Sequence, residues 1–105
     1  VTWGDGASGV TGEVSATNSL VGSHTNDRLG AYGVTELSNG NYFVLSPNWD
    51  NIGASEAGAV TWGSGTEGVS GEVSKDNSLV GTTANDRVGY GGVTELSNGN
   101  YVVRS

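Results

Sequence analysis

Cysteine and methionine are absent from the 105 residues, and proline occurs once. Without cysteine the chain has no disulfide and no zinc site of the cysteine type. A single proline excludes collagen and proline-rich linkers. Only four Lys or Arg stand against eleven Asp or Glu, for a formal net charge of −7. We therefore expect no nucleic acid partner. No apolar run approaches the ~18 residues of a membrane span, so no membrane insertion is expected either.

The dominant feature of the chain is an internal repeat. Residues 1–46 align with residues 60–105 without a gap, and 32 of the 46 pairs are identical, with a period of 59 residues. One unique stretch, residues 47–59 (PNWDNIGASEAGA), separates the copies. We therefore divide the chain into copy 1 (1–46), a connecting loop (47–59) and copy 2 (60–105). Such close copies predict a parent array longer than two units.

Each copy is predicted to form four short strands and no helix. No window has the spacing of an amphipathic helix, and glycine interrupts every candidate. Asn39-Gly40 lies between two apolar runs and predicts a tight hairpin with a type I′ turn. The expected strands are 34–37, 42–46, 60–62 and 78–80, with 1–3 and 19–21 as the copy 1 equivalents of the last two.

The second of these strands is apolar on both faces. Tyr42 and Val44 lie on one face, Phe43 and Leu45 on the other. A strand of this kind must be covered on both faces, which one four-stranded sheet cannot do for itself. We therefore expect each sheet to stack against its neighbours, as in solenoids and propellers.

Three short segments carry a family resemblance. NDRVG (85–89) precedes the first strand, Ser46-Pro47 closes the second, and AGAV (57–60) opens the third. These segments resemble the blades of integrin-type propellers, the FG-GAP repeats, and the resemblance extends over the run NSLVGTTANDRVGYGGVTELSNGNYVVRS. The chain also resembles repetitive surface proteins of the bacterial type. The resemblance implies an all-β propeller of four-stranded antiparallel blades, secreted or at the cell surface. That family often carries an Asp-rich calcium loop, but SNGN is too short and uncharged to hold calcium, so no metal site is expected.

The phase of the repeat predicts how a ring would close. The chain begins with strand three and ends with strand two, so residues 33–81 form one complete blade and the two ends are complementary halves. Sharing a blade between chain ends removes two exposed sheet edges. Three or four chains would supply six or eight blades, within the roughly four to eight typical of propellers. We therefore expect a homo-oligomer that closes the ring.

The connecting loop holds the candidate ligand-binding residues Asn48, Trp49, Asp50 and Asn51. An aromatic face flanked by amides and a carboxylate suits a sugar ring, with stacking for its apolar face and hydrogen bonds for its hydroxyls. Loops on a rigid β scaffold are also a usual place for recognition. The alternative is that this loop simply fills space between blades.

Two pairs of acidic residues recur in both copies. Glu36 and Glu95 lie in the strand that would line a propeller channel, where crowding would raise the pKa of both carboxyl groups and attract cations. Asp27 and Asp86 precede that strand, and their repetition favours a structural role as acceptors of backbone N–H groups.

The remaining features are interpreted as structural. The hexads 4–9 and 63–68 spell G-x-G-x-x-G, but strand-like acidic segments follow them, so tight turns are expected rather than nucleotide sites. Trp3 and Trp62 are expected in the core between blades. His24, the single histidine, has no nucleophile and orienting acid arranged around it, and is expected at the surface.

The sequence therefore predicts a non-catalytic protein without a cofactor. The favoured function is a binding or adhesion module, lectin-like or acting in cell-surface recognition, whose partner is a glycan or another surface ligand. Repeated blades would present weak sites several times over. The alternative is a structural, self-assembling scaffold, or a piece of a long array, that binds no small ligand. No constellation of residues favours an enzyme.

Overall fold

The computed structural model describes all 105 residues. It consists of strands and turns without a helix, and so contains no helix able to cross a membrane. Its strands are β1 (Leu20–Val21), β2 (Val34–Glu36), β3 (Tyr42–Ser46), β4 (Ala59–Gly63), β5 (Gly71–Glu72), β6 (Ser78–Val80), β7 (Gly92–Glu95) and β8 (Tyr101–Arg104).

Four of the strands form a central antiparallel sheet in the order β2-β3-β4-β6. This is the four-stranded unit that the sequence predicts for residues 33–81. The longest pairing joins β3 to β4, with Tyr42 opposite Gly63 and Ser46 opposite Ala59. Both strands are rich in β-branched and aromatic residues, which fit a pleated, buried surface.

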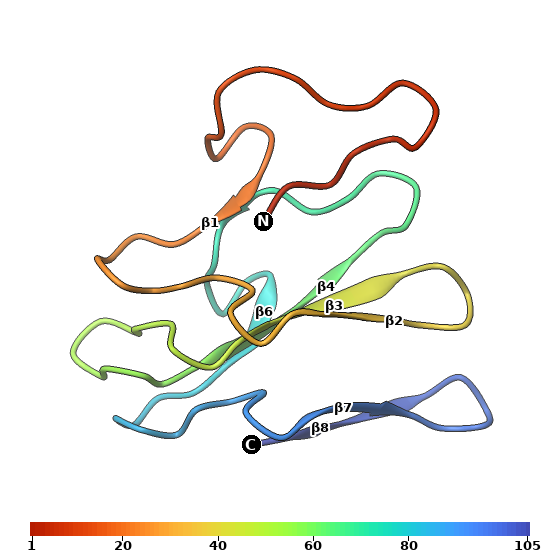
Figure 1. The fold of residues 1–105 in the computed structure, drawn as a ribbon. Helices are drawn as coiled ribbons and strands as arrows, with labels where there is room; N and C mark the ends of the chain where they lie inside the picture. Colours follow the sequence, from red (N-terminus) through yellow and green to blue (C-terminus); the bar gives the residue numbers. More distant parts are fainter.

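Two further layers flank the central sheet, one on each face, so that three layers lie one above another (Figure 1). The N-terminal layer (residues 1–29) contains β1 and an antiparallel bridge between Thr2 and Ser19. The C-terminal layer (residues 88–105) is the β7–β8 hairpin. The N-terminal layer thus holds strands three and four of one unit, and the C-terminal layer holds strands one and two of another.

A separate apolar core lies on each face of the central sheet. Val44 packs with Leu20 in the core shared with the N-terminal layer. Phe43 and Leu45 pack with Val88 in the core shared with the C-terminal layer. The prediction that alternate residues of this strand are buried on opposite faces is confirmed.

The layers are also joined through their backbones, which the sequence did not predict. β1 pairs in parallel with β5, Leu20 opposite Gly71. A second parallel bridge joins Gly58 to Val88, and a Cβ on Gly58 would collide with the Val88 backbone. The glycine therefore permits the close approach of two layers.

The expected hairpin at Asn39-Gly40 is present, but its turn is not type I′. The Gly40 N–H donates to the Leu37 carbonyl at 3.0 Å, and Gly40 has φ +90° whereas Asn39 does not have positive φ. A type I turn followed by a left-handed glycine explains this pattern. One extra loop residue is accommodated in this way, and Gly99 repeats the conformation at φ +90°.

Both glycine hexads form turns, as expected. Asp5 bridges Gly9 and Ser64 bridges Gly68, and the two glycines that close the turns have φ +75° and +76°. No helix follows either turn, so the backbone offers no pyrophosphate site of the dinucleotide-binding kind.

The prediction that both Trp3 and Trp62 are core residues is wrong for Trp62. Trp3 is half-buried and lies against Gly68. Trp62 remains 47% exposed. It lies on the face of the central sheet turned toward the C-terminal layer, which has only two strands with which to cover it. The single chain forms these three layers and no closed ring.

Candidate functional site

The connecting loop (47–59) leaves β3 and returns as β4, and its backbone is folded back on itself. The Trp49 N–H donates to the Ser46 carbonyl at 3.1 Å, and the Gly58 N–H donates to the Trp49 carbonyl at 2.9 Å. Asn51 and Ala54 exchange two further backbone bonds of 3.0 and 2.7 Å. The loop is therefore a compact element.

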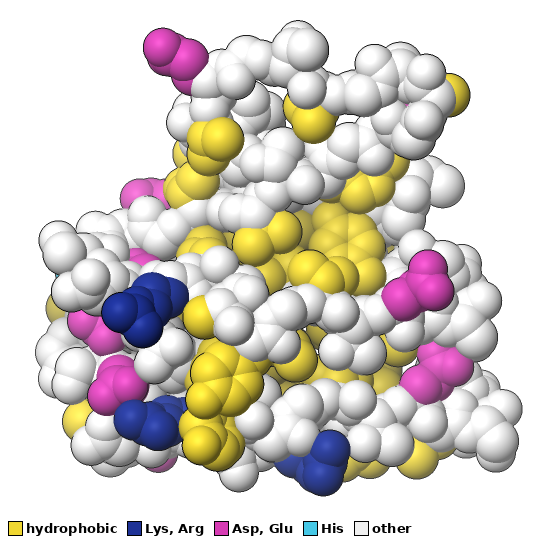
Figure 2. Space-filling model, in the orientation of Figure 1, with side chains coloured by type: hydrophobic (Ala, Val, Ile, Leu, Met, Phe, Trp, Pro, Cys, Tyr) yellow, Lys and Arg dark blue, Asp and Glu magenta, His cyan; other side chains and the backbone are white.

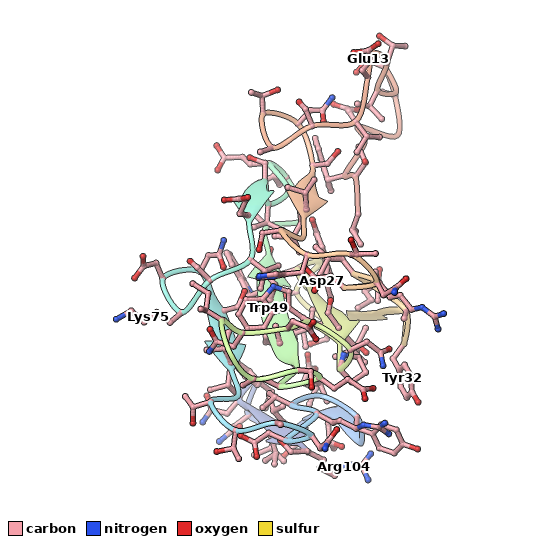
Figure 3. All side chains as sticks on the ribbon, turned by 90° about the vertical axis from the view of Figure 1, so that its left-hand side faces the viewer. Glu13, Asp27, Tyr32, Trp49, Lys75 and Arg104 are labelled. Atoms are coloured by element: carbon pink, nitrogen blue, oxygen red, sulfur yellow. The ribbon has the colours of Figure 1, made fainter.

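Trp49 is a core residue of this chain. It is 4% exposed and packs with Leu20, Val44 and Val73, where it joins the N-terminal layer to the central sheet. Figure 3 shows Trp49 and Asp27 inside the fold, whereas Lys75 and Arg104 project outward. The indole face therefore does not offer an open stacking surface for a sugar ring.

The neighbours of Trp49 hold the loop together. Asn48 donates from Nδ2 to Glu56 Oε1 at 3.0 Å, and the Glu56 N–H donates to Asp50 Oδ1 at 2.8 Å. Asn51 donates from Nδ2 to the Gly81 carbonyl at 2.9 Å. Each of these three side chains thus uses a polar atom in a hydrogen bond within the chain.

A cleft of about 510 Å³ nevertheless runs beside this loop. Its walls include Trp49, Asp50, Asn51 and, from other elements, Glu72 and Lys75. The two charged side chains from the β5 region form no ion pair with each other. The Trp49 Nε1–H is the one buried side-chain polar atom without a hydrogen-bond partner. The structure thus places three of the four predicted residues in the lining of one cleft.

Asp27 anchors the turn before β2, as the sequence predicts. Its Oδ2 accepts the N–H groups of Ser23 and His24, each at 2.9 Å, and its Oδ1 accepts the N–H of Asp50 at 3.1 Å. Asp86 repeats the first two bonds in copy 2. Since Asp27 also holds the connecting loop, it ties copy 1 to the element that follows it.

His24 lies at the surface, with Nδ1 3.1 Å from Ser23 Oγ and 3.9 Å from Asp27 Oδ2. The Ser23 hydroxyl is exposed beside it, and Asp27 is already occupied by backbone N–H groups. The arrangement therefore serves the turn and offers no oriented nucleophile.

A second, wholly polar cleft of about 380 Å³ lies on the other side of the loop. Arg28, Asp50 and Glu56 line it. Glu56 already pairs with Arg87 of copy 2, Nη2 to Oε1, at 3.1 Å. Arg28, which corresponds to Arg87 in the repeat, forms no ion pair. The same arginine therefore joins a loop to the next layer in copy 2 and is free in copy 1.

Glu36 and Glu95 lie at equivalent positions of β2 and β7, in two different layers. Glu95 accepts the backbone N–H of Ser38 at 2.9 Å across the interface between hairpins, and this bond lowers the pKa of its carboxyl group. The expected rise of the pKa is thus wrong for Glu95. Glu36 is exposed in the outermost position of the central sheet. No group of three or more His, Asp or Glu is placed to hold a metal ion.

A family model described as a repeat of unknown function (DUF5650) matches residues 1–31, 36–90 and 95–105. The chain belongs to this family of repeats. No integrin-type or other propeller family is identified, so the resemblance noted above has no support at the level of family. No curated protein and no solved structure matches the chain.

Proposed function

We propose that the chain is a non-catalytic structural unit of a stacked repeat array, in which each four-stranded sheet covers the next. The observation that carries this proposal is the burial of the central sheet on both faces by layers built from the same repeat. A unit that buries its apolar surface mainly against its own kind gains stability from its neighbours, and the array behaves as a one-dimensional stack.

Contacts between the two copies support this function. The rings of Phe43 and Tyr101, from β3 and β8, lie 4.4 Å apart between centroids. The Arg87–Glu56 ion pair and the bond from Ser38 to Glu95 also cross from copy 1 or its loop to copy 2. Each therefore belongs to the stacking of layers.

Blade-like sheets packed face to face are also the way a propeller is built, and the ring of three or four chains expected from the repeat phase remains part of this proposal. A closed ring would have one fixed mass, whereas an open array would grow with concentration. The location outside the cell or at its surface, which the sequence resemblance implied, is proposed together with this role. There, a net charge of −7 per chain would favour solubility.

The experiment that tests the structural role extends the chain in tandem by one 59-residue period. The added unit gives the C-terminal layer its missing strands three and four. We expect the free energy of unfolding in urea to rise by several kcal/mol, because the new interface repeats the one on the other face of the sheet. An extended chain that is no more stable than the original would contradict the proposal.

A second candidate function, recognition of a polar ligand such as a glycan, is favoured by the cleft beside Trp49. Its unpartnered Nε1–H is a buried donor, and such groups are rare enough to need an explanation. Trp49→Phe keeps an aromatic ring in the core and removes the donor. If the original chain binds a glycan on an array and the variant does not, the result would support recognition. If the original chain binds no glycan, only the structural role would remain.

A further inference from the structure

Two grooves remain open on the molecule, one beside each outer layer. The first groove, of about 320 Å³, lies between residues 1–4 and the β2–β3 hairpin, and is lined by Trp3, Val34, Glu36 and Tyr42 among others. Figure 2 shows apolar side chains gathered in the hollow between the N-terminal loops and this hairpin. The groove occupies the place where strands one and two of the N-terminal layer would lie.

The second groove, of about 350 Å³, lies on the opposite face of the central sheet. Phe43, Trp62, Leu79 and Tyr101 contribute to its walls. It occupies the place where strands three and four of the C-terminal layer would lie. The half-layer at each end of the chain therefore has what the other end lacks.

We propose that a second copy of this chain docks head to tail, so that its β8 pairs antiparallel with residues 1–4 of the first copy and completes a four-stranded sheet. The proposal rests on the proposed function, because it takes the stacking within the chain as the pattern for stacking between chains. Main-chain hydrogen bonds would supply affinity, as in other cases of strand addition at a sheet edge.

The β3–β4 pairing within the chain gives the register of the intermolecular one. Adding 59 to the number of each β3 residue gives its equivalent in β8, and subtracting 59 from the number of each β4 residue gives its equivalent in residues 1–4. The resulting pairs are Tyr101 with Gly4, Val102 with Trp3, Val103 with Thr2, and Arg104 with Val1.

The difference in burial between the two copies supports another copy of this repeat as the occupant. Leu37 is 5% exposed, but its equivalent Leu96 is 42% exposed. Leu20 is fully buried, but its equivalent Leu79 is 57% exposed. The residues exposed in one copy are thus those that the other copy buries against a neighbouring layer. A layer of this same repeat fits the surface they leave open, and a second chain would supply such a layer.

The polar groups at the two ends match in the same way. Within the chain, the Ser38 N–H donates to Glu95 across the interface between hairpins. The equivalent acceptor, Glu36, lines the first groove, and the equivalent donor, Ser97, lies in the exposed turn after β7. In the docked pair the Ser97 N–H of one copy would donate to Glu36 of the other.

The surroundings of Gly65 and of its equivalent Gly6 differ at the proposed docking edge. A Cβ on Gly65 would collide with the Gly40 carbonyl, so that the turn after β4 and the β2–β3 turn lie in close contact. Its equivalent in copy 1, Gly6, has no atom within 4 Å of its ideal Cβ position. In the docked pair that empty space would receive the Gly99 carbonyl of the second copy.

The interface joins two different surfaces, so it is heterologous. Such contacts give a closed ring if the rotation per copy closes, and an open filament otherwise. Both chains are acidic, with a net charge of −7 each, and repulsion opposes docking. We expect association to strengthen as salt is raised toward 0.15 M, where the Debye length is about 8 Å.

Site-directed cross-linking tests the register. Because the chain has no native cysteine, only the introduced cysteines can form a disulfide. The backbone hydrogen bonds of Leu45 point toward β2 rather than β4. Phe43, two residues earlier in the same strand, points its bonds the same way. Phe43 and Trp62 therefore form a closely spaced pair without hydrogen bonds between them. The equivalent intermolecular pair is Val102 with Trp3, at a Cα separation of about 4.5 Å that permits a disulfide.

A chain carrying Trp3→Cys is mixed with one carrying Val102→Cys under mild oxidation. We expect a covalent heterodimer to form at least tenfold faster than in the control mixture of Thr2→Cys with Val102→Cys, whose side chains point to opposite faces of the sheet. Equal rates in the two mixtures would overturn the register. Circular dichroism of each single variant serves as the control for folding of both chains.

Gly6→Ala provides an independent measurement without any cysteine. In the isolated chain the new methyl group has open space, so thermal stability in dilute solution should stay unchanged. In the docked pair it would strike a backbone carbonyl, and the association measured by sedimentation should weaken by at least tenfold. A wild-type chain that stays monomeric at high micromolar concentration, or Gly6→Ala chains that associate as wild type, would overturn the proposal.

The outcomes also separate this inference from the function on which it rests. A tandem third copy that stabilises the chain while no intermolecular cross-link forms would retain the structural role and reject docking between chains. Absence of both effects would reject the structural role itself.

Discussion

Leu20 and Leu79 occupy the same position in the two copies of the repeat but lie in different surroundings. Leu20 is fully buried between the N-terminal layer and the central sheet, whereas Leu79 is 57% exposed. Replacing each leucine by alanine therefore compares one side-chain truncation in two environments, within one molecule and with the same local sequence, NSLVG, around both sites.

The expected losses of stability differ by a factor of about three. A buried Leu→Ala change removes the transfer free energy of the side chain and leaves a cavity, which together cost about 3 kcal/mol. At position 79 more than half of the side chain already contacts water, so no closed cavity forms and the cost is about 1 kcal/mol. We therefore expect Leu20→Ala to lower the free energy of unfolding by about 2 kcal/mol more than Leu79→Ala.

Urea denaturation followed by tryptophan fluorescence measures both values, at a protein concentration low enough for the chain to be monomeric. At higher concentration, docking of a second copy would bury position 79, and Leu79→Ala should then weaken association. Equal losses for the two variants in dilute solution would refute the arrangement of layers, because they would require equal burial of the two leucines in a single chain.

Three further comparisons use the repeat in the same way. Gly65→Ala should destabilise the chain by at least about 2 kcal/mol, because the new Cβ meets a backbone carbonyl, whereas Gly6→Ala should change the free energy of unfolding by less than about 1 kcal/mol. Asp27→Ala removes the acceptor of three backbone N–H groups in a buried position and should cost about 3 kcal/mol, against about 1 kcal/mol for Asp86→Ala, which is exposed and accepts two. The pKa of Glu95 is lowered in the folded chain, so its contribution is present above the unfolded pKa and is lost as the pH falls through the folded value. Acid titration of thermal stability should therefore be shallower for Glu95→Gln than for wild type, and an unchanged titration would show that the bond from Ser38 contributes nothing.

The strands and the burial of both sheet faces could be predicted because they depend on local patterns. The apolar residues on both faces of YFVLS, the Asn-Gly hairpin signal and the 59-residue period indicated which segments pair and which faces need cover. The structure confirms the four-stranded sheet and the two cores. The Gly71–Glu72 strand lies in a segment that the sequence marks as strand-like, but its parallel pairing with β1 joins two layers and follows from no local pattern.

The tryptophans show what the sequence could not supply. Trp49 stands among polar residues, which favoured a ligand site, yet it is buried in the core between the N-terminal layer and the central sheet. Asp27 and Gly81, both distant in the chain, bind its neighbours Asp50 and Asn51. Trp62 stands among strand residues and looked buried, yet it is half-exposed. In both cases burial depends on which layer lies opposite, and that is a long-range property.

The two copies share 32 of 46 residues, so their intrinsic strand and turn preferences are nearly the same. The difference in burial between Leu20 and Leu79, or between Leu37 and Leu96, therefore comes from position in the stack rather than from local sequence. When the side chains of a repeat are buried only where a neighbouring layer is present, the interfaces between layers supply most of its stability. An additional layer, whether joined in tandem or docked from a second chain, should then bury the same set of residues and yield a similar gain. Comparing these two gains would measure how far a covalent connection contributes beyond the contacts themselves.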